Sequence, residues 1–279
     1  MKVLLVGGNS SLARCLRPVL AVFAEVVTAG RSGCELLLDL AGPIHIPGGF
    51  DAVVNTAAHL GGSTPAALAT AEETNVLGLL RLGQACAAAG VGHLVHVSSI
   101  FATLPHSSPF HNAYVLSKRH GDEALQLQSR MQELPLTIVR PSQFYGVGKK
   151  FRRNQPFLFK LIDKAQAGQD IELWGQRDAR RNFIHVQDVV DMLASVVQTC
   201  TLGVFTCSYP QDLSYSQIAQ AAVDAFNSGS DIRFLPDKPD MADNIFPFDD
   251  ELYRALGHAP QITIARGMRM EAAHRRSPI

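Results

Sequence analysis

The sequence lacks a net charge, cysteines at C-x-x-C spacing and any long apolar run. Lysine plus arginine number 25, and aspartate plus glutamate also number 25. This balance gives no overall attraction to nucleic acids or anionic membranes, and we expect neither as a partner. No stretch approaches the about 20 apolar residues that a membrane-spanning helix needs. Hydrophobic residues nevertheless make up 47% of the chain, enough for a globular protein with a sizeable core.

The few cysteines are odd in number and widely spaced, which argues against a disulfide framework or a zinc site. We therefore expect reduced thiols and no bound metal. The five are Cys15, Cys34, Cys86, Cys200 and Cys207. At the N-terminus, the apolar run Val3–Val6 is far too short for a signal peptide, so we expect a cytoplasmic location.

Short apolar runs alternate with helix-like segments through the first half of the chain. The runs are apolar almost throughout, as expected for strands buried on both faces of a parallel sheet. They are Val3–Val6, Glu25–Thr28, Ala52–Asn55, Leu94–Val97 and Thr137–Arg140. The helix-like segments between them are Ser11–Ala21, Pro65–Ala89 and Ala113–Gln132. This alternation predicts an α/β fold with a doubly wound parallel sheet.

The pattern changes from about Tyr145 onward, where loops lengthen and the segment GVGKKFRRNQP is basic. Further helix-like segments are Phe157–Ala167, Val186–Gln198 and Ser214–Ala225. We expect a dinucleotide-binding domain over residues 1–148 and a smaller substrate-binding region over 149–279, with segments such as 181–200 returning to the first domain. The tail Met268–Ile279 is expected to be solvated.

The segment GGNSSLA, residues 7–13, follows the first predicted strand, where a phosphate-binding turn would lie. Such a turn is tight, lets the backbone approach a pyrophosphate and packs its helix close to the strand. Gly7 suits the turn, and Ser10 and Ala13 are small residues where two further glycines are usual. Backbone N–H groups at the start of the helix would face the phosphates, namely those of Asn9, Ser10, Ser11 and Leu12. An ordinary strand–turn–helix connection is the alternative.

The next predicted strand is followed by Arg31, without the Asp or Glu that usually holds the ribose diol of NAD. Arginine offers a charged fork that suits the 2′-phosphate of NADP. We therefore expect NADP(H) as the cofactor, with NAD(H) possible. A solvent-facing loop arginine is the alternative interpretation.

Tyr114 and Lys118 are four residues apart on a predicted helix, so both side chains project from one face. A free tyrosine has a pKa of about 10, and a nearby ammonium lowers that pKa. The pair could then exchange a proton with a substrate oxygen while hydride moves to or from a nicotinamide. Ser98 and Ser99, directly after a predicted strand, could donate a hydrogen bond to that oxygen. An ordinary exposed helix face would show the same spacing.

In this order the motifs resemble those of the extended short-chain dehydrogenases/reductases, the NAD(P)-dependent epimerase/dehydratase family. The resemblance covers most of the chain. It rests on GGNSSLA at 7–13, DL at 39–40, VVNTAA at 53–58, NVLG at 75–78, VHVSS at 95–99, YVLSK at 114–118, RPSQFYG at 140–146 and RRNFIHVQDVV at 180–190. It implies a Rossmann-type doubly wound parallel sheet with a smaller C-terminal substrate-binding region.

The resemblance also implies roles for matching positions. Catalysis would fall to Ser99, to Tyr114 as acid/base and to Lys118, which would also hold the nicotinamide ribose. Asn75 would support the site from the central helix. The remaining cofactor contacts would come from Gly7, Ser10, Asp39, Leu40, Ala57, Ala58 and Pro141. Gln143 stands where the family has asparagine, so local contacts there would differ.

A nucleotide-diphosphate sugar is the substrate that the resemblance implies. Arg181 falls on a family arginine that contacts the diphosphate, and Asn154 resembles a substrate-binding asparagine of the sugar-nucleotide subgroup. Arg152 and Arg153 add positive charge, which a diphosphate requires. A solvated basic loop with a structural arginine is the alternative.

The residues after Ser99 limit which of the family's reactions we expect. Family members that remove water from the sugar place Asp-Glu there, whereas this chain has Ile100 and Phe101, so we do not expect 4,6-dehydration. NADP(H) is usual for net reduction, and we expect a reductase of a 4-keto nucleotide-diphosphate sugar. A nucleotide-sugar 4-epimerase and a reductase of a non-sugar carbonyl are the alternatives. The retained Tyr114 and Lys118 argue against a non-catalytic NADP-binding sensor. The resemblance further implies a homodimer.

Overall fold

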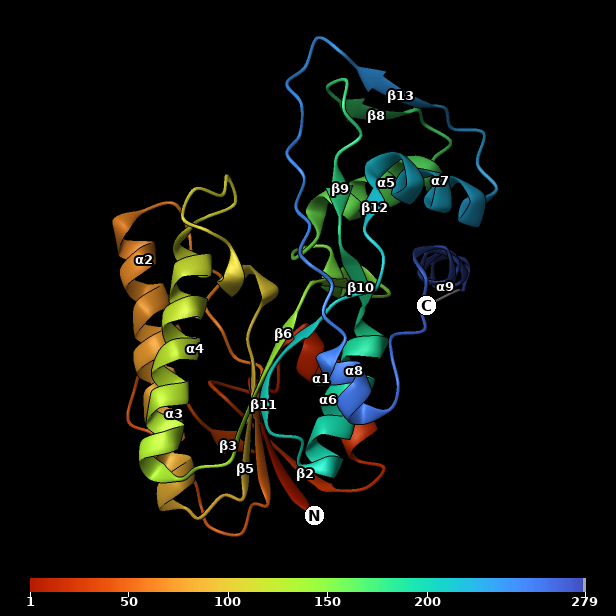
Figure 1. Cartoon of the computed structure of the whole chain (residues 1–279). Coiled ribbons are helices and arrows are strands. Elements are labelled where there is room, and N and C mark those ends of the chain that lie inside the picture. Colours follow the sequence, from red (N-terminus) through yellow and green to blue (C-terminus); the bar gives the residue numbers. More distant parts are fainter. Residues whose placement is uncertain (278–279) are drawn as a thin grey trace. The chain divides into compact units, whose positions relative to one another are not determined.

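The computed structural model describes residues 1–277 and contains a seven-stranded sheet in the order β11-β6-β5-β4-β1-β2-β3 (Figure 1). The strands are β1 Lys2–Val6, β2 Glu25–Gly30, β3 Leu36–Leu37, β4 Ala52–Asn55, β5 His93–Val97, β6 Leu136–Pro141 and β11 Gly203–Cys207. All neighbouring strands pair in parallel. Their carboxyl ends therefore lie along one side of the sheet, which we call the carboxyl edge and define by Val6, Gly30, Asn55, Val97 and Pro141. The predicted α/β fold with a Rossmann-type parallel sheet is confirmed.

The central strands form where the sequence is continuously apolar. Every residue of β4 and β5 is buried, as are the last four of β1. All five predicted strands are present, with ends that differ by no more than two residues. The sequence did not predict β3, which is only two residues long, or β11, whose burial is incomplete.

Helices cover both faces of this sheet (Figure 1). One face carries α2 Pro65–Glu72, α3 Gly78–Ala88 and α4 Ala113–Gln132. The other carries α1 Ser11–Leu20, α8 Glu251–Leu256 and α6 Val186–Thr199. Two short turns, the π-helical η1 Glu73–Leu77 and the 3₁₀ turn η2 Ile100–Thr103, complete the segment up to β6. Over residues 1–277, no helix combines the length and the apolar character needed to cross a membrane.

The single helix expected over Pro65–Ala89 is interrupted by the π turn η1. A π turn contains one extra residue, so it rotates the side chains that follow relative to those that precede it. Two glycines allow the close packing around this turn. A Cβ on Gly78 would lie 2.5 Å from the carbonyl oxygen of Leu40, and one on Gly121 would lie 2.4 Å from that of Asn75.

The chain divides into two compact units. The first comprises Met1–Pro141, Val190–Cys207 and Asp250–His258, and the second comprises Ser142–Val189, Ser208–Asp249 and the segment from Ala259 onward. The sequence placed the first boundary at 148 and the returning segment at 181–200. The difference arises because β7 Gln143–Tyr145 pairs with β10 Phe183–His185 and not with the large sheet.

The second unit consists of short strand pairs and helices. β8 Ile171–Trp174 pairs in parallel with β13 Ile232–Leu235, and β9 Arg180–Arg181 pairs antiparallel with β12 Leu213–Ser214. Its helices are the 3₁₀ turn η3 Lys149–Phe151, α5 Pro156–Gln166, α7 Tyr215–Phe226 and α9 Ile264–Arg276. α7 packs against both α5 and α9.

The expectation of a solvated tail holds for only part of the segment Met268–Ile279, where Arg269, His274 and Arg276 are exposed. Residues up to Arg276 lie in α9, where Met268, Glu271 and Ala272 are buried. The Glu271 carboxylate accepts hydrogen bonds from the backbone N of Gly148 and from Nε of Arg275, both at 2.7 Å. The last two residues of the predicted tail lie outside the described part of the chain. The arginines and histidine of the tail suggested solvation, but α9 also has an apolar side that contacts α7.

Candidate active site

The loop after β1 lies at the carboxyl edge and contacts both neighbouring strands. The N–H groups of Gly7 and Gly8 donate to the carbonyl oxygen of Ala29 at 2.9 and 3.1 Å. Gly7 has φ = 77°, and a Cβ there would lie 2.7 Å from the backbone N of Ala57. Both facts require glycine at position 7, because other residues rarely adopt positive φ and no side chain fits.

The other two glycine positions of the turn have no such requirement. Ser10 is the N-cap of α1 with φ = −64° and ψ = 154°, an ordinary conformation for serine, and its Oγ accepts from the N–H of Ala13 at 3.0 Å. The same Oγ lies 3.0 Å from Oγ1 of Thr56. Ala13 is fully buried, so its small size is used for packing. The two substitutions therefore preserve the turn.

The N–H groups of Ser11 and Leu12 lie in the first turn of α1, where donors have no partner within the helix. The side chain of Asn9 binds the loop after β2, because its Nδ2 donates to the carbonyl oxygen of Ser32. The start of α1 thus offers backbone donors beside a glycine, the arrangement that binds phosphate groups at a helix N-terminus.

Arg31 is exposed directly after β2, at the carboxyl edge. The carboxylate in this turn that sequence reasoning overlooked is Glu35, whose Oε2 accepts from the N and the Oγ1 of Thr28 at 2.7 and 2.6 Å. These hydrogen bonds hold the pKa of Glu35 below its usual range. Glu35 is therefore engaged with β2, while the arginine extends toward solvent.

Four further predicted cofactor positions lie on the loops around β3 and β4. Asp39 is exposed and its Oδ1 accepts from the N–H of Ala41 at 3.1 Å, whereas Leu40 is buried. Ala57 and Ala58 follow β4 at the carboxyl edge, and the N–H of Ala57 donates to Oδ1 of Asn55 at 3.0 Å. Pro141 ends β6 at the same edge.

The three predicted catalytic residues lie in the first unit, near the carboxyl ends of β5 and β6. Ser99 follows β5 as the N-cap of η2. Tyr114 and Lys118 lie in the first turns of α4, whose N-cap is Asn112. Burial raises the pKa of the Tyr114 phenol, and a hydrogen bond with Ser99 offsets part of that rise. The neutral phenol next to the serine hydroxyl is a proton donor at neutral pH.

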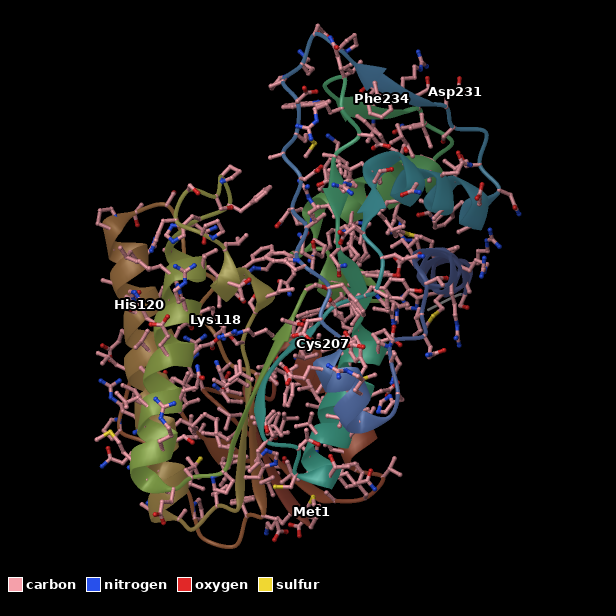
Figure 2. The ribbon with its side chains drawn as sticks, in the orientation of Figure 1. Met1, Lys118, His120, Cys207, Asp231 and Phe234 are labelled. Carbon is pink, nitrogen blue, oxygen red and sulfur yellow. The ribbon has the colours of Figure 1, made fainter. Side chains whose placement is uncertain are left out.

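Lys118 is only 2% exposed and points from α4 toward the sheet, whereas His120 on the same helix faces α2 (Figure 2). Nζ of Lys118 donates to the carbonyl oxygen of Val97 at 3.0 Å and lies 3.2 Å from Nε2 of His96. Burial lowers the pKa of Lys118 to about 8, although the carboxylate of Asp122 opposes this change. The lysine can therefore gain and lose a proton near neutral pH.

Asn75 binds α4 from within the π turn. Its Oδ1 accepts from the N–H of His59 at 2.8 Å, and its Nδ2 donates to the carbonyl oxygen of His59 and to Oγ of Ser117 at 2.8 and 2.9 Å. These bonds fix α4 relative to η1 and to the loop after β4. That loop also approaches Tyr114, because a Cβ on Gly61 would lie 2.7 Å from the backbone N of Tyr114.

Sequence reasoning missed a polar network beneath Lys118. Asp122 is fully buried, accepts from Nε of Arg140 at 2.7 Å and lies 4.0 Å from Nε2 of His96. His96 is itself a buried, hydrogen-bonded residue, with Nδ1 3.2 Å from Nδ2 of Asn55. The available signal was the spacing of Lys118 and Asp122, which places both on one face of α4.

The predicted substrate residues lie in the second unit. Arg181 is 4% exposed, its Nη1 donates to the carbonyl oxygens of Arg180 and Ala242 at 2.8 and 2.7 Å, and its guanidinium lies 4.7 Å from the ring centre of Tyr215. Asn154 is exposed in the turn before α5. These two residues are thus presented differently, one held against carbonyls and an aromatic ring and the other facing solvent.

Comparison with known proteins yields relatives that include reductases, dehydratases and epimerases. A dTDP-4-dehydro-6-deoxy-D-allose reductase from Streptomyces bikiniensis is 28% identical over 129 residues, which is 46% of this chain and 40% of the relative. A dTDP-glucose 4,6-dehydratase from Streptomyces niveus is 25% identical over 234 residues, covering 79% of this chain and 68% of the relative. The chain thus aligns with about two fifths of the length of the reductase.

A solved structure, the UDP-N-acetylglucosamine 4-epimerase from Bacillus cereus, superposes with a TM-score of 0.78 and covers 100% of this chain and 98% of its own. At 16% identity this likeness shows the fold alone. The family model of the NAD dependent epimerase/dehydratase family matches residues 42–204. That segment runs through β4, the π turn with Asn75, the Ser99, Tyr114 and Lys118 cluster and on into β11, and on this evidence the chain belongs to the NAD dependent epimerase/dehydratase family.

Proposed function

We propose that the chain is an NADP(H)-dependent oxidoreductase that reduces a 4-keto nucleotide-diphosphate sugar, with Tyr114 as the acid/base. One observation carries the proposal: a neutral phenol, a serine hydroxyl and a buried lysine with a lowered pKa lie together near the carboxyl edge of the sheet. In doubly wound sheets, ligands bind at that edge.

The loop after β1 fits a dinucleotide. Gly7 leaves the backbone bare where a Cβ would collide with Ala57, and the first turn of α1 supplies N–H donors from Ser11 and Leu12. Arg31 would pair with a 2′-phosphate, which is the reason to propose NADP(H) over NAD(H). Asp39, Leu40, Ala58 and Pro141 would complete the contacts with the cofactor.

A bound NADPH would supply the hydride that reduces the carbonyl carbon. Tyr114 would hold its proton until charge develops on the carbonyl oxygen and would then donate it. Ser99 would donate a hydrogen bond to the same oxygen and stabilise that charge. Lys118 would hold the nicotinamide ribose and favour the tyrosinate that remains. The raised pKa of Tyr114 suits this direction, because it keeps the proton on the phenol until it is needed.

The residues after Ser99 favour reduction over dehydration. Ile100 is buried, and it and Phe101 form the 3₁₀ turn η2 where dehydratases of this family would carry Asp-Glu. No carboxylate is therefore supplied from that turn for an elimination. A 4-epimerase remains the alternative activity, since it would use the same phenol and serine but return the hydride to the sugar.

We propose that Asn154 and Arg181 bind the nucleotide-diphosphate sugar, with Arg181 contributing positive charge and Asn154 an amide. The exposure of Asn154 supports a contact that the resting protein does not use. Asn154→Ala should weaken sugar-nucleotide binding and leave NADPH binding unchanged in parallel calorimetric titrations. Equal affinity for the sugar nucleotide in both proteins would remove Asn154 from the binding site.

We further propose that the chain forms a homodimer through α3 and α4. Leu127 and Met131 on α4 are 54% and 77% exposed, and Leu77 beside α3 is 47% exposed. Packing these side chains against the same helices of a second copy would bury them. Met131→Lys should shift the protein to a monomer in sedimentation experiments, and a wild-type protein that sediments as a monomer would refute the proposal.

The experiment that tests the function begins with thermal shifts for dTDP-, UDP- and GDP-sugars in the presence of NADPH, because a ligand of the native state raises the melting temperature. The 4-keto form of the nucleotide sugar that binds is then supplied, and loss of NADPH absorbance is followed. Tyr114→Phe should keep NADPH affinity and lose roughly 100-fold or more in rate. Interconversion of two sugars without net NADPH loss would identify the epimerase instead.

A further inference from the structure

Three buried side chains form a chain of contacts that ends at Lys118. Asn55, His96 and Lys118 are 1%, 2% and 2% exposed. Nδ2 of Asn55 lies 3.2 Å from Nδ1 of His96, and Nε2 of His96 lies 3.2 Å from Nζ of Lys118. The residues come from β4, β5 and α4, so the contact is built by tertiary packing.

The first member of this chain fixes the protonation of the second. Oδ1 of Asn55 accepts from the backbone N–H of Ala57 at 3.0 Å, and a backbone N–H can only donate. The amide nitrogen of Asn55 must therefore face His96 and donate to its Nδ1. Burial, with the charge of Arg140 adding to it, holds the pKa of His96 well below its usual range, so the ring is neutral. A neutral ring that accepts at Nδ1 carries its proton on Nε2.

The Nε2–H of His96 then faces Lys118. An ammonium has three donors and no lone pair, so it cannot accept this hydrogen bond. An amine can accept it while donating to the carbonyl oxygen of Val97, which lies 3.0 Å from Nζ. The alternative acceptor for Nε2–H is Oδ1 of Asp122, but at 4.0 Å it is beyond hydrogen-bond distance.

The other charged groups facing Lys118 act in opposite directions. Asp122, on the same helix, favours the ammonium. Arg140 on β6 donates to Asp122 at 2.7 Å and so neutralises much of that carboxylate. Tyr114, one turn earlier on α4, is neutral until its proton is used. Among these groups, His96 directs a donor N–H at Nζ.

We propose that His96 is a positioning residue for Lys118: held by Asn55 with its proton on Nε2, it stabilises the amine form and lets the lysine exchange a proton with Tyr114 during turnover. This proposal rests on the proposed function, in which Tyr114 gives up a proton in each cycle. After that step the tyrosinate would be reprotonated by the Lys118 ammonium, and the resulting amine would accept the hydrogen bond from His96. The amine would then regain a proton from water, so that each turnover takes up one proton from solution.

His96→Gln tests the proposal, because a glutamine can turn its oxygen toward Lys118 and favour the ammonium. We expect the midpoint of the Lys118 titration to rise by about one pH unit, the size expected for exchanging one hydrogen bond. The titration is followed by NMR on protein with isotopically labelled lysine, with Lys118→Arg for assignment. The pH at which the rate of NADPH oxidation falls on the basic side should move upward by the same amount.

His93→Gln is the matched control. His93 lies on the same strand, is 3% exposed and contacts Thr137 at 2.7 Å instead of Lys118. It should leave the Lys118 midpoint unchanged. An equal shift in both variants, or no shift in His96→Gln, would overturn the proposal, because a merely structural histidine would give those results.

A measurement on the unmodified protein decides the matter if His96→Gln does not fold. Nitrogen NMR of histidine-labelled wild type should show His96 as the Nε2–H tautomer, and Asn55→Asp should convert it to Nδ1–H. An Nδ1–H tautomer in the wild type would overturn the proposal. These spectra need no substrate, so an enzyme that turns over no carbonyl would refute the proposed function while leaving this test intact.

Discussion

The absence of a side chain at Gly7 allows the stability loss of a Gly7→Ala variant to be predicted from the structure. Gly7→Ala introduces two penalties, the positive φ of 77° and a Cβ that would lie 2.7 Å from N and 2.9 Å from Cα of Ala57. The left-handed conformation costs an alanine roughly 1–2 kcal/mol. Overpacking against backbone adds about 1–3 kcal/mol, because neither strand end can move freely. Together we expect a loss of about 2–5 kcal/mol in the free energy of unfolding.

Gly90→Ala separates the two penalties. Gly90 has a similar φ of 68°, but no atom lies within 4 Å of its hypothetical Cβ. This variant should lose only the conformational part, roughly 1–2 kcal/mol. Chemical denaturation followed by circular dichroism measures both variants against wild type, and the difference between them reports the contact with Ala57.

NADPH affinity provides the second readout for the same pair. The displaced loop of Gly7→Ala should weaken NADPH by roughly tenfold or more, since 1.4 kcal/mol is a factor of ten. Gly90→Ala should bind NADPH as the wild type does. If the two variants lose equal stability and both bind NADPH normally, the close approach of the loop to β4 is wrong, and with it the phosphate-binding role of this turn.

Three further predictions concern the charge of Arg31, the attachment of α9 through Glu271, and the dependence of stability on pH. Arg31→Ala should weaken NADPH by roughly 10–100-fold and NADH by much less, as expected for a charge-assisted contact with a 2′-phosphate; equal losses in fluorescence titrations would contradict it. Glu271→Ala should cost about 1–3 kcal/mol in denaturation, because it strands the buried N–H of Gly148 and frees α9, and an unchanged midpoint would contradict this. Burial lowers the pKa of His93 and His185 to about 4, so as pH falls the unfolded chain takes up protons first and stability is lost between about pH 6.5 and 4. His93→Gln should remove one of these contributions, up to about 1.4 kcal/mol per pH unit, from the measured slope, and an unaltered slope would show that His93 is not held neutral.

Much of the first unit could be predicted because its signals are local. β4 and α4 begin and end where their apolar runs and caps predict, and Asn112 caps α4 just before Tyr114. Tyr114 and Lys118 share a helix face because of their spacing alone. Their position near Ser99 follows from one assumption, that β5 and β6 are parallel neighbours, which the structure confirms.

The features that sequence analysis missed depend on contacts between distant segments. The π turn at Asn75 depends on packing against Leu40 and Gly121 and leaves no mark in the apolar period. The His96–Lys118 contact requires β5 to lie beside α4, and the buried Asp122 is paired with Arg140 from β6. None of these contacts can be predicted from a local pattern of residue types.

The same reason explains the two differences in the second unit. Gln143–Tyr145 leaves the first unit because its strand partner lies about forty residues later in β10. The C-terminal segment forms α9 because Glu271 reaches Gly148 and Met268 is buried. Both outcomes are decided by contacts between segments far apart in the sequence, which composition alone does not reveal.

The most direct test of the central claim follows a deuterium atom from the nicotinamide C4 of NADPH into the product. With the 4-keto nucleotide sugar that binds, wild-type protein should place the label on C4 of the sugar, and Tyr114→Phe should bind NADPH equally well yet transfer almost none. Label at C4 in equal amounts from both proteins would contradict the role of Tyr114, and no label at any sugar carbon would contradict the reductase itself.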